Sequence, residues 1–539
     1  MPNTFREALE AGEFVVTCEM IPGRGACEDA QERLFSEARD IYATGRVHAI
    51  SVTDNPGGNP ALLADAVGVQ LLDEGITPLV HFTCKDRNRN QIMSQLYALQ
   101  RAGVENLLLM TGDYQVGGWM GRSRPVFDLD SVQVQMLVRQ MNEGLVVQGR
   151  KGLSAEKPTG FFAGGVVNPF KYREGEAVPQ YLKMEKKVVA GARFLIGQVG
   201  YDPRKLQETR QYLCERGLEV PLIANVFVLT RGAARLMRSG SIAGCYVSDA
   251  LMDTLEREAA QADKGRPERA ERAAQMVAIA KGLGYAGVHI GGFGVDAALV
   301  ERVLGRAEQI GDAWRDYLDA NSFGKPGGYY VYAPELDAQG APTGLNAAAR
   351  SGQHEPAPGG AVFKRYRLSR VAHWWMLTLG KRFERVLARV MDRRDAKRGV
   401  HRAHGIEHTG KALLYGCVDC GDCGLEAAAY SCPMAACPKS QRNGPCGGSY
   451  DGWCEVYPHE RYCIWYMAFH RAARYDEMWR IDSFITPPNH WEYHGTSPWS
   501  NYTHERDNAA YRIPVSLGLD GAPGGKTAGT DEALAQHGA

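Results

Sequence analysis

Short apolar stretches rich in β-branched residues alternate with longer amphipathic stretches between residues 13 and 292. The short stretches predict strands at 13–20, 47–53, 76–83, 104–110, 160–167, 193–199, 220–226 and 285–291. The intervening stretches carry apolar residues at helical spacing and predict helices at 28–44, 60–74, 89–102, 130–143, 179–191, 203–217 and 297–310. Because strands and helices alternate, we expect successive strands to run parallel.

Eight strands spread over roughly 300 residues favour a closed (β/α)8 TIM barrel. An open doubly wound sheet is the alternative that this pattern leaves. Two connections are long: one at 111–129, after the fourth strand, and one at 227–284, after the seventh, where two additional helices are predicted. Barrel enzymes build their sites from loops at the C-terminal ends of the strands, so these two connections are candidate parts of a site.

The chain of 539 residues is longer than one compact core usually requires. A stretch at 333–362 is rich in Ala, Pro and Gly and lacks periodicity, which indicates a boundary. We expect a barrel at 1–320, an irregular linker at 321–362, a basic amphipathic helical segment at 363–410, a cysteine-rich metal-binding domain at 411–513 and a disordered tail at 514–539. The basic segment predicts either a solvated face packed on the barrel or a docking surface for an acidic partner.

Charge and hydropathy exclude several classes of protein. Lys+Arg and Asp+Glu both number 62, so the chain is no polyelectrolyte, and we expect no nucleic-acid partner. No apolar run of about 18 residues occurs, and the start lacks the charged and apolar regions of a signal peptide. We therefore expect a cytoplasmic protein without membrane contact.

The predicted strands end in unusually polar residues. These are Glu19, Thr53, Asp54, Asn55, His81, Thr83, Thr111, Gly112, Asp113, Asn168, Gln198 and Asn225. Turn formation accounts for some of them, Thr111-Gly112-Asp113 in particular. A carboxylate such as Glu19 inside an apolar strand is costly to bury unless it is paired or functional, so Glu19 is the strongest candidate for chemistry.

Eight of the thirteen cysteines fall within 47 residues, at Cys417, Cys420, Cys423, Cys432, Cys437, Cys446, Cys454 and Cys463. In a reducing compartment such a cluster binds metal more often than it forms disulfides. The two-residue spacings and the Cys-Pro steps at 432 and 437 are typical of ferredoxin-type iron–sulfur ligation. Two tetrahedral zinc sites are the alternative, because zinc knuckles share the two-residue spacing.

The ordered set EFVVTCEM, PLVHFTC, NLLLMTGD and KKVVAGARFLIGQV resembles the methylenetetrahydrofolate reductases, over about residues 1–310. The resemblance implies a barrel that binds FAD, whose reduced N5 gives a hydride to the methylene carbon of methylenetetrahydrofolate. The cysteine segment is similar to a small domain found with this family in acetogen-type members. There it carries iron–sulfur clusters, which implies [4Fe-4S] clusters that relay electrons or stabilise the fold.

The resemblance also implies roles for individual residues. Glu19 would be the general acid that protonates folate N10, a role that needs a raised pKa. Asp113 would stabilise the cationic iminium, and Gln198 would hydrogen-bond the pterin. The residues expected to hold FAD are Thr53, His81, Thr83, Thr111, Gly112, Asp113, Phe127, Asn168 and Lys187. The chain departs from the family at Thr111, where many members have Arg, and at Gln180 and Lys183, which replace an acidic residue and an amide.

The expected activity is reduction of methylenetetrahydrofolate to methyltetrahydrofolate, or the reverse reaction. The expected partners are the tetrahydrofolate substrate, NADH or a ferredoxin-like electron donor, and further copies of the chain in an oligomer. Two other functions are consistent with the same residues. One is a zinc-dependent methyltransferase on a folate barrel, and the other is a non-catalytic electron-transfer or scaffold subunit with iron–sulfur clusters.

Overall fold

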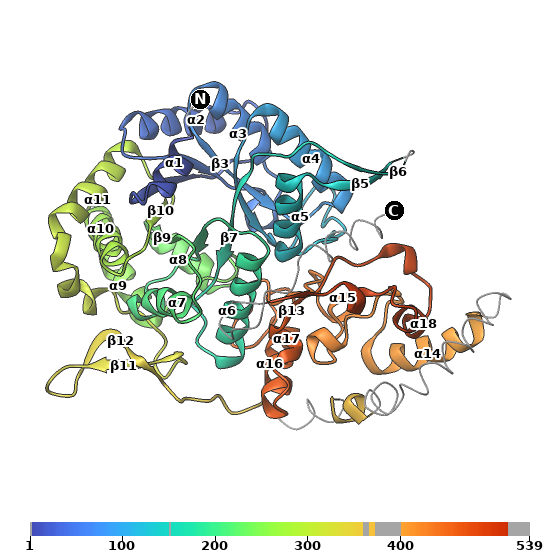
Figure 1. Ribbon diagram of the computed structural model, residues 1–539. Coiled ribbons are helices and arrows are strands. Elements are labelled where there is room, and N and C mark those ends of the chain that lie inside the picture. Colours follow the sequence, from blue (N-terminus) through green and yellow to red (C-terminus); the bar gives the residue numbers. More distant parts are fainter. Residues whose placement is uncertain (1–2, 150–151, 359–365, 372–399, 516–539) are drawn as a thin grey trace.

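The computed structural model describes residues 3–149, 152–358, 366–371 and 400–515. Its largest unit is a closed barrel of parallel strands in the order β1-β10-β9-β8-β7-β4-β3-β2 (Figure 1). The barrel strands are β1 (Val15–Met20), β2 (Ala49–Val52), β3 (Pro78–Thr83), β4 (Asn106–Met110), β7 (Phe162–Val167), β8 (Leu195–Gly197), β9 (Leu222–Phe227) and β10 (Gly287–Gly291). The predicted (β/α)8 barrel is confirmed.

Helices surround the barrel. They are α2 (Asp29–Ala43), α3 (Ala64–Asp73), α4 (Arg89–Ala102), α5 (Ser131–Glu143), α6 (Glu174–Val189), α7 (Pro203–Glu215), α8 (Arg231–Arg238), α9 (Asp249–Ala259), α10 (Arg266–Gly282) and α11 (Ala297–Ile310). The two additional helices predicted after the seventh strand are α9 and α10, whereas α8 was not predicted. Helix α6 begins five residues before its predicted start, and its residues Val178 and Leu182 pack in an apolar cluster with the C-terminal region.

Alternation along the strands gives the barrel two different surfaces. In β1, Val16, Cys18 and Met20 belong to the core between strands and helices, whereas Val15 and Glu19 lie inside the barrel. The N-terminal end of the interior is apolar and is closed by helix α1 (Thr4–Glu10), whose fully buried Phe5 enters it. The polar side chains gather toward the opposite, C-terminal end.

Two hairpins lie outside the barrel. Strands β5 (Val146–Gly149) and β6 (Gly152–Ala155) form one, which the sequence pattern did not predict. The segment 321–362, expected to be irregular, contains the other, formed by β11 (Tyr332–Leu336) and β12 (Pro342–Arg350). That expectation is wrong in this part. The hairpin is held against α7 by tertiary contacts, such as Asn346 N donating to Gln207 Oε1 at 2.6 Å, which no local pattern reveals.

The C-terminal region lies beside α6 (Figure 1). Its elements are α14 (Val400–Tyr415), α15 (Pro433–Ala436), α16 (Ile464–Arg474), α17 (Trp479–Asp482), α18 (Pro498–Thr503), β13 (Phe484–Ile485), β14 (Ile513–Pro514) and short 3-10 turns. Most of the expected basic segment, at 372–399, and of the expected tail, at 516–539, lies outside the described residues.

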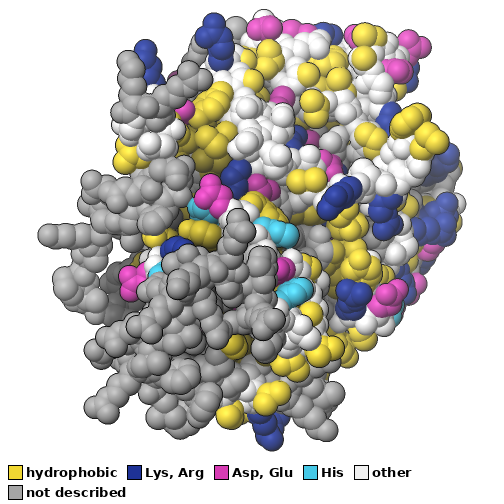
Figure 2. Space-filling model, turned by 90° about the vertical axis from the view of Figure 1, so that its right-hand side faces the viewer, with side chains coloured by type: hydrophobic (Ala, Val, Ile, Leu, Met, Phe, Trp, Pro, Cys, Tyr) yellow, Lys and Arg dark blue, Asp and Glu magenta, His cyan; other side chains and the backbone are white. Residues whose placement is uncertain are grey.

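Charges are mixed on the described part of the surface. On the face shown in Figure 2, acidic and basic side chains are interspersed with hydrophobic ones, in agreement with the balanced composition. No helix among the described residues is both long enough and apolar enough to cross a membrane.

Candidate active site

A cavity of about 680 Å³ opens at the C-terminal ends of the barrel strands. Cavities of this size are typical of sites for small molecules and cofactors. Ten of the eleven barrel residues expected to have a catalytic or cofactor-binding role line it: Glu19, Thr53, His81, Thr83, Thr111, Gly112, Asp113, Asn168, Lys187 and Gln198. The barrel thus brings together side chains from strand ends that are far apart in the chain.

Phe127 does not line this cavity. Its ring is buried and stacks on Tyr114, with 6.3 Å between the ring centroids. Its backbone forms a bridge with Arg87. The position of Phe127 therefore gives no support to the expected cofactor contact.

Glu19 is the last but one residue of β1, and its side chain is 16% exposed. Its Oε1 lies 3.9 Å from His289 Nε2, and His289 Nδ1 hydrogen-bonds Thr17 Oγ1 at 2.8 Å. Burial raises the pKa of Glu19, but the interaction with His289 and its positive charge hold that pKa below its ordinary value. The expected raised pKa is therefore wrong for this arrangement, because the sequence argument omitted His289.

Sequence reasoning missed His289, although a signal existed. It lies in the middle of β10, on the strand that pairs with β1, and its register partner is Thr17. Alternation places His289 on the same inner surface as the strand-end residues. A rule that examined the inward positions of each strand, and not only its last residue, would have found it.

His81 forms the second histidine position of the cavity. Its Nε2 hydrogen-bonds Ser51 Oγ at 2.7 Å, and its ring centroid lies 6.2 Å from that of His289. Burial, followed by the charge of His289, lowers the pKa of His81 to about 4. His81 is therefore neutral near pH 7 and serves as a hydrogen-bonding group.

Asp54 organises the adjacent wall of the cavity. Its Oδ2 accepts hydrogen bonds from Thr83 N at 3.1 Å, from Thr83 Oγ1 at 2.7 Å and from Arg87 Nη1 at 2.8 Å. Both charged side chains are buried, so the ion pair fixes the end of β3. The Thr83 hydroxyl, expected to contact a cofactor, is committed to Asp54 as a donor.

The loop after β4 depends on a glycine. Gly112 has φ +84°, and a Cβ there would lie 2.8 Å from Lys85 Cγ and 2.9 Å from Thr83 Cβ, so a larger residue does not fit. The neighbouring Asp113 accepts a hydrogen bond from Gly57 N through Oδ2 at 2.7 Å. This bond joins the loops that follow β2 and β4 and holds the Asp113 carboxylate at the cavity.

The C-terminal region supplies one wall of the cavity. Residues 439–449, here termed the mouth segment, cross the barrel opening. Gln441 Oε1 accepts hydrogen bonds from Lys183 Nζ at 2.8 Å and from Thr111 Oγ1 at 3.0 Å, and the Gly447 carbonyl accepts one from Asn168 Nδ2 at 2.8 Å. Thr111 and Asn168, expected to contact a cofactor, therefore hold the mouth segment.

Lys439 extends this wall toward Asp113. It donates from Nζ to the Gly112 carbonyl at 2.8 Å and forms an ion pair with Glu455, and both charged side chains line the cavity. Sequence reasoning assigned neither residue to the site, because both lie more than 300 residues along the chain from Gly112. No local sequence motif indicates that these two residues reach the barrel cavity.

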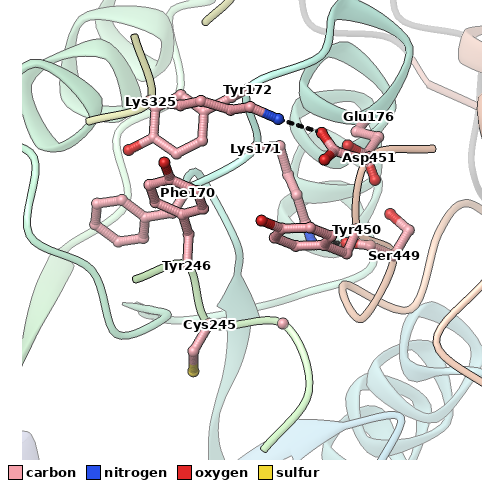
Figure 3. A pocket seen from close by; sticks show the side chains of 11 residues that line it. Phe170, Lys171, Tyr172, Glu176, Cys245, Tyr246, Lys325, Ser449, Tyr450 and Asp451 are labelled. Atoms are coloured by element: carbon pink, nitrogen blue, oxygen red, sulfur yellow. Dashed lines mark hydrogen bonds and ion pairs between the residues drawn. The ribbon is translucent and has the colours of Figure 1, made fainter. Parts of the chain in front are cut away.

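A smaller pocket beside the cavity shows how the two regions join (Figure 3). Lys171 donates to the Ser449 carbonyl, and Lys325 forms an ion pair with Asp451. The Tyr172 ring packs against Tyr246 on the barrel side, with 4.7 Å between centroids. These contacts extend the interface that the mouth segment forms between the C-terminal region and the barrel.

Lys187 lies at the cavity wall on α6. Its Nζ donates to the Val166 carbonyl of β7. Burial lowers its pKa to about 7, and the nearby charge of Lys183 acts in the same direction. The Lys187 amine therefore carries only part of its positive charge near neutral pH.

The eight clustered cysteines are all free thiols, and seven of them are partly exposed. Cys417, Cys420, Cys423 and Cys432 line one pocket beside α14. Among the described residues, no three or more His, Cys, Asp or Glu side chains converge closely enough to hold a single metal ion. The structure thus leaves the predicted metal sites unconfirmed.

The family model described as "Methylenetetrahydrofolate reductase" matches residues 4–301, which is more than half of the chain. The chain belongs to the methylenetetrahydrofolate reductase family. A second model, described as "Methylene-tetrahydrofolate reductase C terminal", matches residues 398–492. In this family member the first match contains all ten predicted cavity residues, and the second contains the mouth segment and the cysteine cluster. Membership supports an oxidoreductase activity on a folate.

One similar solved structure is described as "Uncharacterized protein from Clostridium thermocellum binds two copies of 5-methyl-5,6,7,8-tetrahydrofolic acid". It is 14% identical to this reductase-family chain, with a TM-score of 0.39. The alignment covers 57% of this chain and 98% of that one.

Proposed function

We propose that this family member interconverts 5,10-methylenetetrahydrofolate and 5-methyltetrahydrofolate with bound FAD. One observation carries the proposal: in a barrel of this family, Glu19, Asp113 and Gln198 line a single cavity with His289. Bound FAD would supply a hydride from N5 to the methylene carbon in the reductive direction. The chain itself has to bind the flavin and the pterin, exclude water and donate or accept one proton.

The cavity lining is consistent with a flavin and a pterin. Asn225 Oδ1, Gln180 Nε2 and Asp54 Oδ1 are buried, belong to cavity residues and lack hydrogen-bond partners among the described residues. Buried polar atoms of this kind are costly unless a ligand or water satisfies them. We assign flavin contacts to Thr53, His81 and Lys187, and contact with the pterin to Gln198, whose Oε1 accepts from Val199 N and leaves its amide donor for a ligand.

We assign the proton to the Glu19 and His289 pair. Because the pKa of Glu19 is lowered, its ground state is the carboxylate, which suits it to accept a proton when methyltetrahydrofolate is oxidised. In the reductive direction a proton held between Glu19 and His289 would pass to folate N10. Asp113 would place its negative charge beside the cation that follows ring opening.

The electrons would reach the cavity from outside the barrel. We propose a ferredoxin-like one-electron donor acting through metal clusters held by the eight cysteines, with NADH as the other donor to be tested. The mouth segment supports this route, because it contains Cys446, which lines the cavity.

The absorption spectrum of anaerobically purified protein, with iron and zinc quantified, tests the class of protein. The proposal predicts flavin bands together with broad iron–sulfur absorption. A colourless zinc protein would identify the folate-barrel methyltransferase instead, and brown protein without flavin bands would identify an electron-transfer or scaffold subunit.

The substitution Glu19→Gln tests the acid–base role. We expect FAD content to stay at the wild-type level while folate turnover falls at least about 100-fold, since general acid–base catalysis contributes roughly that much. Glu13→Gln, at an exposed position of the same segment, is the matched control and should retain full turnover. Wild-type turnover in Glu19→Gln would remove Glu19 from the mechanism.

A further inference from the structure

We infer that the eight cysteines form two separate four-thiol sites, each holding one [4Fe-4S] cluster, and that only one of them borders the barrel cavity. The far set is Cys417, Cys420, Cys423 and Cys432, and the near set is Cys437, Cys446, Cys454 and Cys463. This inference deepens the proposed function. It rests on that function for the role of the near cluster, which borders the barrel cavity. In two-cluster ferredoxins the fourth cysteine of the run ligates the other cluster, so spacing alone would assign Cys432 to the near set.

The far set is defined by a shared pocket. All four of its thiols line the same small pocket, and so does Lys411, whose Nζ lies 4.0 Å from Cys423 Sγ. Asp419 N donates to Cys417 Sγ at 3.4 Å. A cation and a backbone amide directed at sulfur stabilise thiolates, which are the ligand form of cysteine. The pocket contains Cys432 and none of the near set.

The near set is joined by contacts between its own segments. Cys454 N donates to the Arg461 carbonyl at 2.9 Å, and Cys463 N donates to the Gly452 carbonyl at 2.8 Å. The segments that contain Cys454 and Cys463 therefore lie side by side. The Cys446 thiol donates to Glu455 Oε1 at 3.5 Å. Glu455 in turn pairs with Lys439, two residues after Cys437. These contacts connect the segments of chain that carry the four cysteines of the near set.

The two sets differ in their relation to the barrel. Cys446 lines the cavity, and the carbonyls of Gly444 and Pro445 beside it accept hydrogen bonds from Lys183 at 3.3 and 3.1 Å. Gly444 has φ +133°, and a Cβ there would lie 2.8 Å from Lys183 Cβ, so the chain approaches α6 as closely as glycine allows. The far set lies beside α14 and contributes no residue to the cavity lining.

The spacing of these cysteines favours iron–sulfur clusters over zinc, because the two-residue steps and the Cys-Pro steps at 432 and 437 are typical of ferredoxin-type ligation. A tetrahedral zinc site would instead hold four sulfurs at about 2.3 Å from one ion. The sets are separated only by the four residues of α15, about 6 Å of helix, so two clusters would lie next to each other.

Paired substitutions distinguish the two assignments of Cys432. We expect Cys420→Ser with Cys432→Ser to lose half of the iron and inorganic sulfide and Cys432→Ser with Cys454→Ser to lose both clusters. The ferredoxin-type assignment predicts the opposite pattern, and that result would overturn our inference. Cys27→Ser with Cys214→Ser, both at exposed positions of the barrel region, is the control and should keep all the iron.

A second measurement does not depend on how the variants fold. Stepwise removal of metal from the wild-type protein, with alkylation and mass spectrometry after each step, should expose the cysteines in two groups of four, the far set and the near set. Labelling of Cys432 together with Cys454, labelling of all eight at once, or four-cysteine zinc sites in place of iron would each overturn the inference. Flavin absorbance and folate turnover, recorded on the same samples, report separately on the proposed reaction.

Discussion

Pairs of side chains, not single residues, set the chemistry of the cavity floor. His289 bonds Thr17 on one side and faces Glu19 on the other, and His81 bonds Ser51. These polar residues occupy inward positions of neighbouring strands. Burial there disfavours the charged form of each side chain, and only a hydrogen-bonding or charged partner can stabilise that form. The charge of each group is therefore decided by its neighbour across the strands.

Substitution of His81 should change the acid stability of the protein. Its folded-state pKa, about 4, lies below the ordinary value of 6.5, so the unfolded chain binds more protons between these pH values and stability falls as pH falls through this window. In His81→Gln this loss should be smaller by about 2–3 kcal/mol at pH 4.5. Urea unfolding at pH 7 and 4.5 measures it.

The exposed His494 provides the control for that experiment. His494→Gln should show the same pH dependence as the wild type. A His81→Gln protein that loses as much stability as the wild type between pH 7 and 4.5 would contradict the assignment of a lowered pKa.

Helix α1 is the element that closes the barrel at the end opposite the cavity. Phe5 is fully buried, and its ring makes edge contacts with Phe162 at 6.1 Å and with Phe194 at 5.1 Å between centroids. The cap of this helix also contributes, because Asn3 accepts from Arg6 N at 3.1 Å. The short helix is thus held by its packing rather than by its length.

The substitution Phe5→Ala should destabilise the protein by about 3–5 kcal/mol, because the cavity left under the barrel has no group to fill it. Glu7→Ala, on the exposed side of α1, should change stability by less than about 0.5 kcal/mol. Chemical denaturation measures both. Equal stability of the two variants would show that α1 does not seal the barrel.

At the scale of the whole molecule, the mouth segment makes one functional unit from two regions. Asp130 connects them: its Oδ1 caps α5, while its Oδ2 accepts from Arg442 N at 3.1 Å and from Asn443 N at 2.9 Å. A carboxylate that satisfies two backbone amides of another region is a strong buried anchor. The cavity wall therefore depends on a residue that does not line the cavity.

Loss of this anchor should loosen the C-terminal region. Asp130→Ala should lower stability by about 3–5 kcal/mol through the lost cap and the buried amides left without an acceptor. Asp130→Asn keeps the oxygen that caps α5 but not the acceptor for the mouth segment, so it should still speed release of the C-terminal region in limited proteolysis. The matched control is Asp296→Ala, which removes the cap of α11 and an exposed ion pair with Arg266 but no contact with the C-terminal region.

Proteolysis of Asp130→Asn at the wild-type rate would show that the Asp130 contact does not hold the mouth segment. Faster release in Asp296→Ala to the same extent would show that loss of any helix cap is sufficient.

The sequence alone determined the barrel, because strand and helix periodicities are local and each repeat carries its own pattern. It also located most of the cavity residues at the strand ends, since polar side chains there meet wherever parallel strands close into a barrel. It misplaced the start of α6 and missed the β11–β12 hairpin, because contacts with distant segments, not local spacing, stabilise those parts.

The tertiary structure decided everything that depends on distant neighbours. It placed His289 beside Glu19 and so reversed the expected direction of the Glu19 pKa. It brought Lys439 and Gln441 to the barrel mouth and assigned Cys432 to one pocket with Cys417. The physical reason is the same in each case. Electrostatic and hydrogen-bonding partners act through space, and the spacing of residues along the chain does not show which distant residues become neighbours.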